Sequence, residues 1–266
     1  DARFLRSLPH MPRLVMGWRA ADVPLGTDWT GYDVVLSALP RMLALATTLG
    51  ARAGELYYPG MPEWIAREVE PVAKDTDVVF AGSVSPTQHA RRFQLLHQLA
   101  ESALEKGFSL ALHLACDAKD LPPVIRRFWR PPVFGLDMHR ALARGRIVID
   151  CQGDIGVTAP DGRRLMDLAA GDTANMRLWE ATAGGSLLLT EHLPGLGRIF
   201  AEGEEIAVYR DDKDCLDQIT YYLAHADERC RMAAQGRARC LGQWNMKRRA
   251  AAYHDIVKRH LAGKES

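Results

Sequence analysis

Short apolar segments alternate with helical segments along most of this 266-residue chain. Segments with strand character occur at 13–18, 32–38, 54–60, 77–83, 108–115, 146–150, 186–191 and 206–210. Helical patterns separate most of them, including those over 86–106 and near 195–200. This alternation favours a parallel sheet, because each helix returns the chain to the edge from which the strand started. We therefore predict an α/β fold with a Rossmann-like parallel sheet and helices on both of its faces.

A polar stretch divides the chain in two. Residues 61–76 contain Pro62 and Pro71, a composition typical of an interdomain linker. We predict a partial Rossmann-like domain over 1–66 and a larger one over 67–266, closed by C-terminal helices. The first segment holds only half of a doubly wound domain, and no initiator Met precedes it, so we expect the chain to begin within something larger.

Composition excludes several classes of protein. Hydrophobic residues make up 47% of the chain and charged residues 25%, with a formal net charge of +1. No overall positive field attracts nucleic acid. The five cysteines form no C-x-x-C pair, so we expect reduced thiols, a cytoplasmic protein and no zinc site. No apolar run approaches the roughly 20 residues that span a bilayer, and no signal-peptide pattern opens the chain.

One stretch, from Gly171 to Glu191, has the pattern of a phosphate site. It begins as a polar loop, continues as an amphipathic helix, breaks at Gly184-Gly185 and ends in an apolar strand. A helix entered from a loop rich in Gly and Asp presents free backbone N–H groups to anions. An ordinary packed helix and strand is the alternative, and this stretch alone does not decide between them.

Other turns should share an edge with this stretch. In parallel sheets, ligands bind beyond the carboxyl ends of the strands. The residues that follow or end three strands are Gly82 and Ser83, Gly153 and Asp154, and Thr190 and Glu191. We expect these three turns to open on one crevice. The glycine-rich segment 151–173 is expected to be a long loop and a candidate mobile element over that site.

Several motifs in order carry a resemblance to a known family. They include VVFAGS at 78–83, PPVFGLDMHRALARGRIVID at 131–150 and NMRLWEATAGGSLLLTE at 175–191. Over about residues 77–257 the chain resembles the C-terminal half of GT-B glycosyltransferases, in the group that contains CgeB-like proteins and group 1 glycosyl transferases. Residues 1–60 look similar to the second half of the N-terminal domain of that family. The resemblance implies a nucleotide-sugar donor held mainly by the C-terminal domain.

The resemblance also implies roles for individual residues. Glu180 matches a Glu that hydrogen-bonds the ribose hydroxyls, although an i, i+3 pair with Arg177 is the alternative. Asp172 lies where related retaining enzymes carry an acidic residue near the donor sugar, but it is also suited to a helix N-cap. Asn175 and Arg177 match the N-x-R segment of the family, where Asn175 and the backbone N–H groups of residues 174–176 would meet the diphosphate. Arg177 could instead anchor the helix through a surface pair.

Further matches concern the base and the leaving group. Phe134 and Gly135 belong to a V-F-G turn that packs near the base in the family, with a plain hydrophobic turn as the alternative. Gly82 and Ser83 match a turn after the first strand of its C-terminal domain. Arg91 or Arg92 would supply the cation that stabilises the departing diphosphate. His89 and His139 are weaker candidates, because a lone His is more often structural.

The implied function is a glycosyltransferase, of hexosyltransferase type, that moves a sugar from a nucleoside-diphosphate sugar to an unknown acceptor without a metal or cofactor. Asp212-Lys213-Asp214 is interpreted as a helix cap and not as a metal clamp. The alternative is a non-catalytic module that binds a nucleotide or nucleotide sugar with a partner protein. A sugar-nucleotide epimerase lacks a persuasive catalytic set here. The basic run 229–249 is compatible with weak membrane-surface contact, although a solvated helix face is favoured.

Overall fold

The computed structural model describes residues 4–5, 7–10, 12–69, 73–85, 89–153, 155–173 and 175–263. Their contacts divide the chain into two compact units. The first comprises residues 1–59, 154–174 and 246–266, and the second comprises residues 60–153 and 175–245. The predicted boundary near residue 66 falls close to the first change of unit, between residues 59 and 60. The three later changes, after residues 153, 174 and 245, have no counterpart in the prediction. As sequence domains, 1–66 and 67–266 stay a prediction.

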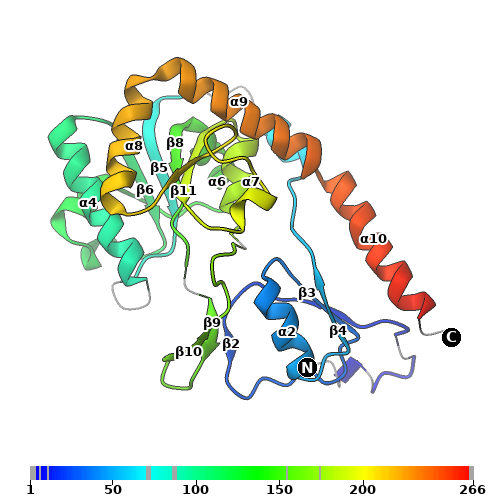
Figure 1. The fold of residues 1–266 in the computed structure, drawn as a ribbon. Coiled ribbons are helices and arrows are strands. Elements are labelled where there is room, and N and C mark those ends of the chain that lie inside the picture. Colours follow the sequence, from blue (N-terminus) through cyan, green and yellow to red (C-terminus); the bar gives the residue numbers. More distant parts are fainter. Residues whose placement is uncertain are drawn as a thin grey trace. The chain divides into compact units, whose positions relative to one another are not determined.

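A six-stranded sheet forms the centre of the second unit (Figure 1). Its strands are β5 (Thr76–Gly82), β6 (Leu110–Leu114), β7 (Trp129–Arg130), β8 (Gly145–Ile149), β11 (Leu187–Glu191) and β12 (Ala207–Tyr209). They lie in the order β12-β11-β8-β5-β6-β7, and every neighbouring pair is parallel. The predicted parallel sheet is confirmed.

Helices cover both faces of this sheet. The described helices of the unit are α3 (Glu63–Glu68), α4 (Ala90–Lys106), α5 (Pro123–Phe128), α6 (Gly135–Arg144), α7 (Arg177–Ala183), α8 (Asp212–Ala224) and α9 (Ala226–Gln243). Residues Ile147 and Ile149 of β8 face a core that α4, α5 and α8 complete. The intervening Val148 is also fully buried, on the face where α6 packs on β5 and β8. Successive side chains of β8 point to opposite faces of the sheet, and helices cover both faces, so all three residues are buried.

A smaller parallel sheet belongs to the first unit. It contains β1 (Met16–Trp18), β3 (Val34–Ser37) and β4 (Ala53–Leu56), in the order β1-β3-β4. Helix α2 (Pro40–Thr48) lies so close to β4 that a Cβ on Gly54 would meet the Leu43 backbone at 2.7 Å. Only glycine permits this approach.

The last helix covers the other face of the small sheet. Helix α10 (Met246–Ala262) packs its one fully buried side chain, Ile256, against Val34 and Leu36 of β3. Glu55 of β4 accepts hydrogen bonds from Arg259 and His260 of the same helix. The C-terminal helix therefore supplies the layer that the first sixty residues lack.

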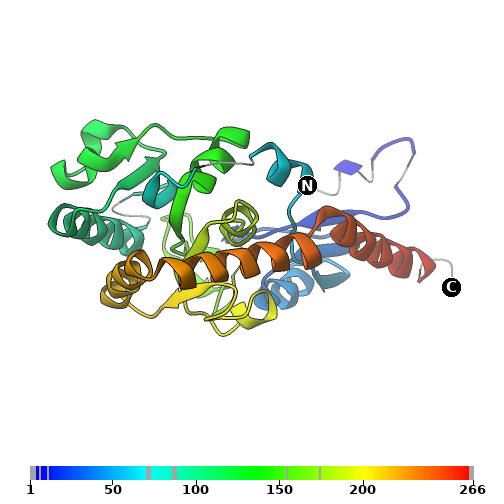
Figure 2. The ribbon, with the colours of Figure 1, turned by 90° about the horizontal axis from the view of Figure 1, so that it is seen from above.

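A second small sheet corrects one prediction. The segment 151–173 is not one long loop: it contains β9 (Gly156–Thr158) and β10 (Arg164–Asp167), an antiparallel pair that β2 (Val23–Pro24) extends. The Asp22 carboxylate accepts a hydrogen bond from the Gly156 N–H at 2.7 Å. Figure 2 shows the whole ribbon seen from above. Strands β2 and β9 are only two and three residues long, and they pair across more than 130 residues of sequence. A local sequence pattern therefore gives little indication of this sheet.

Two predicted helices also differ. The helix expected near 195–200 is only a 3₁₀ turn, Leu196–Arg198. The helix of the 171–191 stretch begins only at Arg177, so residues 171–176 all precede it. Of the predicted helix over 86–106, residues 86–88 lie outside the described part, and α4 begins at Ala90.

Candidate functional site

The candidate site lies at the carboxyl edge of the six-stranded sheet. Strands β5, β8 and β11 belong to one run of neighbours in that sheet, so the turns after them meet at the same edge. This confirms the predicted shared edge for Gly82 and Ser83, for Gly153, and for Thr190 and Glu191. Asp154 lies outside the described residues.

Asp150, the last polar residue of the RIVID segment, organises this edge. Its side chain is buried and accepts hydrogen bonds from Asn175 Nδ2 and from Thr190 Oγ1, the latter at 2.9 Å. Its carbonyl accepts one from the Tyr209 hydroxyl at 2.9 Å. Burial raises the pKa of Asp150, while the Thr190 bond and the charge of Arg177 oppose that rise. Sequence reasoning missed this residue, although an acidic residue ending an apolar strand was the available signal.

Asn175 joins the start of α7 to this carboxylate. Its Oδ1 accepts a hydrogen bond from the Arg177 N–H at 3.1 Å, and its Nδ2 donates to Asp150. The amide therefore fixes the first turn of α7 to the end of β8. Ala174 lies outside the described residues, so the predicted row of N–H groups from 174 to 176 is described only in part.

Arg177 and Glu180 form a largely buried ion pair on α7. Arg177 Nη1 lies 2.8 Å from Glu180 Oε2, and Arg177 Nη2 donates to the Ala81 carbonyl at 2.8 Å. Their side chains are only 11% and 14% exposed. Burial raises the pKa of Glu180, and the Arg177 charge lowers it in part. The i, i+3 pair is thus present, and Arg177 anchors α7 to β5 from a buried position and not as a surface pair.

The two arginines of α4 have different surroundings. Arg92 donates to the Ser83 carbonyl at 2.8 Å and to the Cys151 carbonyl at 2.7 Å, so it clamps the ends of β5 and β8 together. Arg91 pairs with Glu191, and its side chain is 66% exposed. Of these two cations, Arg91 is the more exposed, whereas Arg92 is half-buried.

A cavity of about 720 Å³ adjoins this cluster. Its lining includes Arg91, Glu191, His192, Tyr209 and Lys213. Ligand pockets are usually about 300–1,000 Å³, so a nucleotide-sized molecule fits the volume. The predicted capping segment, Asp212-Lys213-Asp214, forms the first turn of α8. The N-cap itself is the preceding Asp211, whose carboxylate accepts from the Asp214 N–H at 2.8 Å.

The predicted base-binding turn lies at the start of α6. Phe134 is 73% exposed, and Gly135 takes a φ of 54°, in the left-handed region. The turn follows β7 and so belongs to the same edge of the sheet. Further along α6, His139 is buried; burial and the Arg177 charge lower its pKa. Among the described residues, its Nδ1 has no hydrogen-bond partner.

Asp172 belongs to the first unit, and its place relative to Glu180 is therefore not described. Its N–H donates to the Ala169 carbonyl at 2.8 Å. Since α7 begins at Arg177, Asp172 is not the N-cap of that helix, and this alternative is wrong. The role near the donor sugar stays a prediction.

Comparison with known proteins gives a consistent result. The model of a family described as glycosyl transferase-like matches residues 75–255. No curated protein sequence matches significantly. Within the described residues, no helix has the length and apolarity to cross a bilayer.

Solved structures share the fold. One is Anabaena Alr3699/HepE in complex with UDP and glucose, with a TM-score of 0.61 and 14% identity over 85% of this chain and 63% of that one. Another is AviGT4, a glycosyltransferase involved in avilamycin A biosynthesis, with a TM-score of 0.59 and 22% identity over 98% and 78%. A third is sucrose-phosphate synthase from Thermosynechococcus elongatus, with a TM-score of 0.56 and 14% identity over 87% and 59%. This chain therefore spans about three fifths of HepE and of the synthase, and its fold is the α/β GT-B type.

Proposed function

Because this chain belongs to the glycosyl transferase-like family, we propose that it transfers a sugar from a nucleoside-diphosphate sugar to an acceptor. The family match includes every candidate residue of the second unit. The HepE structure contains UDP and glucose, which makes UDP-glucose the first donor to test. The placement of Glu180 carries the proposal most directly.

Glu180 is suited to a ribose. It lies on α7 beside the carboxyl edge of the sheet, and Arg177 holds its carboxylate in place. A carboxylate accepts from two adjacent hydroxyls at once, and a pre-positioned one loses little conformational entropy on binding. One oxygen can keep the Arg177 contact while the other accepts from the ribose.

We also assign the diphosphate and the base of the nucleotide sugar to residues at the carboxyl edge of the sheet. We assign the diphosphate to the turn at Gly82 and Ser83, to Asn175 and to Arg91, and the base to Phe134 and Gly135. Arg91 is exposed and already paired with a carboxylate, so a phosphate oxygen can replace Glu191 as its partner. Arg92 supports this arrangement by fixing the backbone of Ser83 and Cys151.

In the proposed reaction, the main task of the protein is to stabilise the negative charge that develops on the leaving group. The bond between the anomeric carbon and the leaving oxygen breaks, its electron pair passes to the diphosphate, and the acceptor oxygen bonds to the anomeric carbon and loses its proton. Arg91 stabilises the charge that grows on the diphosphate, more strongly in the transition state than in the ground state. Asp172 is proposed to act near the donor sugar, and no metal or other cofactor is required.

The narrower assignments are part of the proposal. They are a hexosyl donor, kinship with the CgeB-like group, a cytoplasmic location and weak contact of the basic run 229–249 with a membrane surface. The acceptor is left open.

Turnover tests the proposal. The chain would be incubated with UDP-, GDP-, ADP- and dTDP-sugars, with water and with candidate saccharides as acceptors, and release of nucleoside diphosphate would be followed. We expect release from one donor class, unaffected by a chelator, and strongly reduced release in Arg91→Gln. Donor binding without any release would favour the non-catalytic binding module. If no donor binds and none releases a nucleoside diphosphate, both the transferase and the binding-module function are refuted.

A further inference from the structure

A second cavity lies at the opposite edge of the six-stranded sheet, where the strands begin. Its volume is about 620 Å³. Lys74 precedes β5, Arg146 is the second residue of β8, and Gly185 precedes β11, and all three line it. One wall is α9, through Arg229, Cys230 and Arg237. The cavity therefore belongs to the amino edge, away from the candidate donor site.

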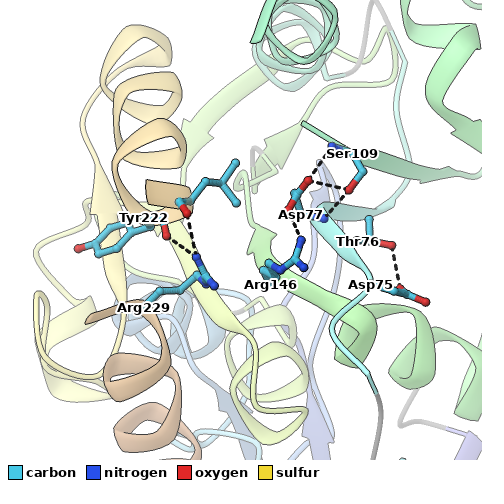
Figure 3. Close-up of polar contacts among 8 residues, drawn as sticks. Asp75, Thr76, Asp77, Ser109, Arg146, Tyr222 and Arg229 are labelled. Carbon is cyan, nitrogen blue, oxygen red and sulfur yellow. Dashed lines mark hydrogen bonds and ion pairs between the residues drawn. The ribbon is translucent and has the colours of Figure 1, made fainter. Parts of the chain in front are cut away.

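The lining is strongly basic. Among the described residues, the lining includes Lys74, Arg146, Arg229 and Arg237 and no Asp or Glu. Arg146 pairs through Nη1 with Asp77, which does not line the cavity (Figure 3). Arg229 is only 8% exposed and donates from Nη1 to the Tyr222 carbonyl at 2.5 Å. In the described part of the chain these are single-nitrogen contacts, so Arg146 and Arg229 retain Nε and Nη2 for a ligand.

The C-terminal ends of three helices offset part of this positive charge. Lys74 Nζ donates to the Ala143 carbonyl at the end of α6 at 2.7 Å, and Arg237 Nε donates to the Ala183 carbonyl at the end of α7 at 3.1 Å. Arg229 does the same at the end of α8. A helix C-terminus carries about half a negative charge. Three such ends and Asp77 offset only about 2.5 of the four positive charges.

The positive charge that remains uncompensated is unfavourable in a buried site unless an anion binds there. Burial lowers the pKa of Lys74 to about 8, while the neighbouring Cys230 raises it and Arg237 lowers it. An anion in the cavity would relieve this repulsion between cations. Guanidinium groups match phosphate oxygens in pairs, and those of Arg146 and Arg229 line this cavity. The Lys74 ammonium group donates to the Ala143 and Gly184 carbonyls and to Ser186 Oγ, so it contributes its charge and not a free donor.

We propose that this cavity is a binding site for a small molecule bearing two or more phosphate groups, separate from the donor site at the carboxyl edge. The volume fits a ligand of that size. The inference does not rest on the proposed transferase function, because it depends only on the cavity and its four cations. Inorganic pyrophosphate is the simplest probe.

Cys230 provides a local readout. It is exposed and lines the cavity, whereas Cys116 is half-buried, lies outside the lining and serves as the internal reference. Modification of each thiol by a dianionic aromatic disulfide and by an uncharged maleimide would be followed by peptide mass spectrometry. We expect the dianionic reagent to favour Cys230, and pyrophosphate to slow modification there about tenfold while leaving Cys116 unchanged. An unchanged Cys230 rate, or equal slowing at both thiols, would overturn the proposal.

A matched pair of variants tests the cations themselves. Arg237→Gln removes a lining charge, and Arg231→Gln removes an exposed charge of the same helix that does not line the cavity. We expect the first to weaken pyrophosphate protection of Cys230 about tenfold and the second to leave it unchanged. Equal protection in both variants contradicts the proposal. The wild-type comparison of the two thiols decides the matter if Arg237→Gln fails to fold.

Discussion

At the residue scale, Asp150 holds the polar groups of the carboxyl edge together. Asn175 and Thr190 both donate to its buried carboxylate. We expect Asp150→Ala to lower the free energy of unfolding by about 1–3 kcal/mol, because two buried groups lose their acceptor. Asp150→Asn keeps an acceptor oxygen and should lose less. Urea unfolding measures both changes, and an alanine variant as stable as wild type would show that the network is unimportant.

The protonation of Asp150 gives a second prediction at this scale. Burial raises its pKa above the ordinary 3.8. The folded chain therefore holds this proton at pH values where the unfolded chain has lost it. The associated stabilisation is complete below pH 3.8 and is lost as pH rises through the higher folded pKa. Wild type should lose stability relative to Asp150→Asn across that window in thermal melts. A difference that does not change with pH contradicts this.

At the element scale, α10 completes the first unit. Ile256 is 5% exposed and packs on β3. We expect Ile256→Ala to destabilise that unit by about 2–5 kcal/mol, because removing a buried side chain leaves a cavity. The half-buried neighbour Val257 provides the control, and Val257→Ala should cost clearly less. Hydrogen exchange of β3 and β4 amides reports on the unit itself. Equal effects of the two substitutions would show that α10 is not part of this core.

The β9–β10 hairpin offers another test at this scale. A Cβ on Gly156 would lie 2.4 Å from the Met166 carbonyl oxygen, a backbone atom that cannot move cheaply. We expect Gly156→Ala to destabilise the hairpin by about 1–3 kcal/mol. Gly197→Ala is the control, since no atom lies within 4 Å of its added Cβ. Proteolysis within 151–173 should accelerate only in the first variant; unchanged cleavage would indicate that the segment is a loop after all.

At the scale of the whole molecule, the sequence predicted what depends on local pattern. Apolar strands separated by helices were enough for the parallel sheet, and strand ends were enough to bring Gly82, Ser83 and Glu191 to one edge. Non-local pairing was not predictable in the same way. The short strand β9 pairs with β2, and α10 packs on strands some 200 residues earlier. No local periodicity records such partners.

The candidate site was likewise predictable only in part. A motif was enough to predict Glu180 and Asn175, whereas Asp150 was identified only from the side chains that donate hydrogen bonds to it. Arg91 and Arg92 were equivalent in the sequence, and only their contacts distinguish a clamp from an accessible cation.

Donor binding tests the central claim most directly. Calorimetry of the whole chain with UDP, GDP, ADP and dTDP should give binding by at least one, with Glu180→Ala weakened about 10- to 100-fold because a charged acceptor of the ribose is lost. Glu204→Ala, an exposed substitution in the same unit, should bind as wild type. The proposed donor site is contradicted if no nucleoside diphosphate binds, or if Glu180→Ala binds as tightly as wild type.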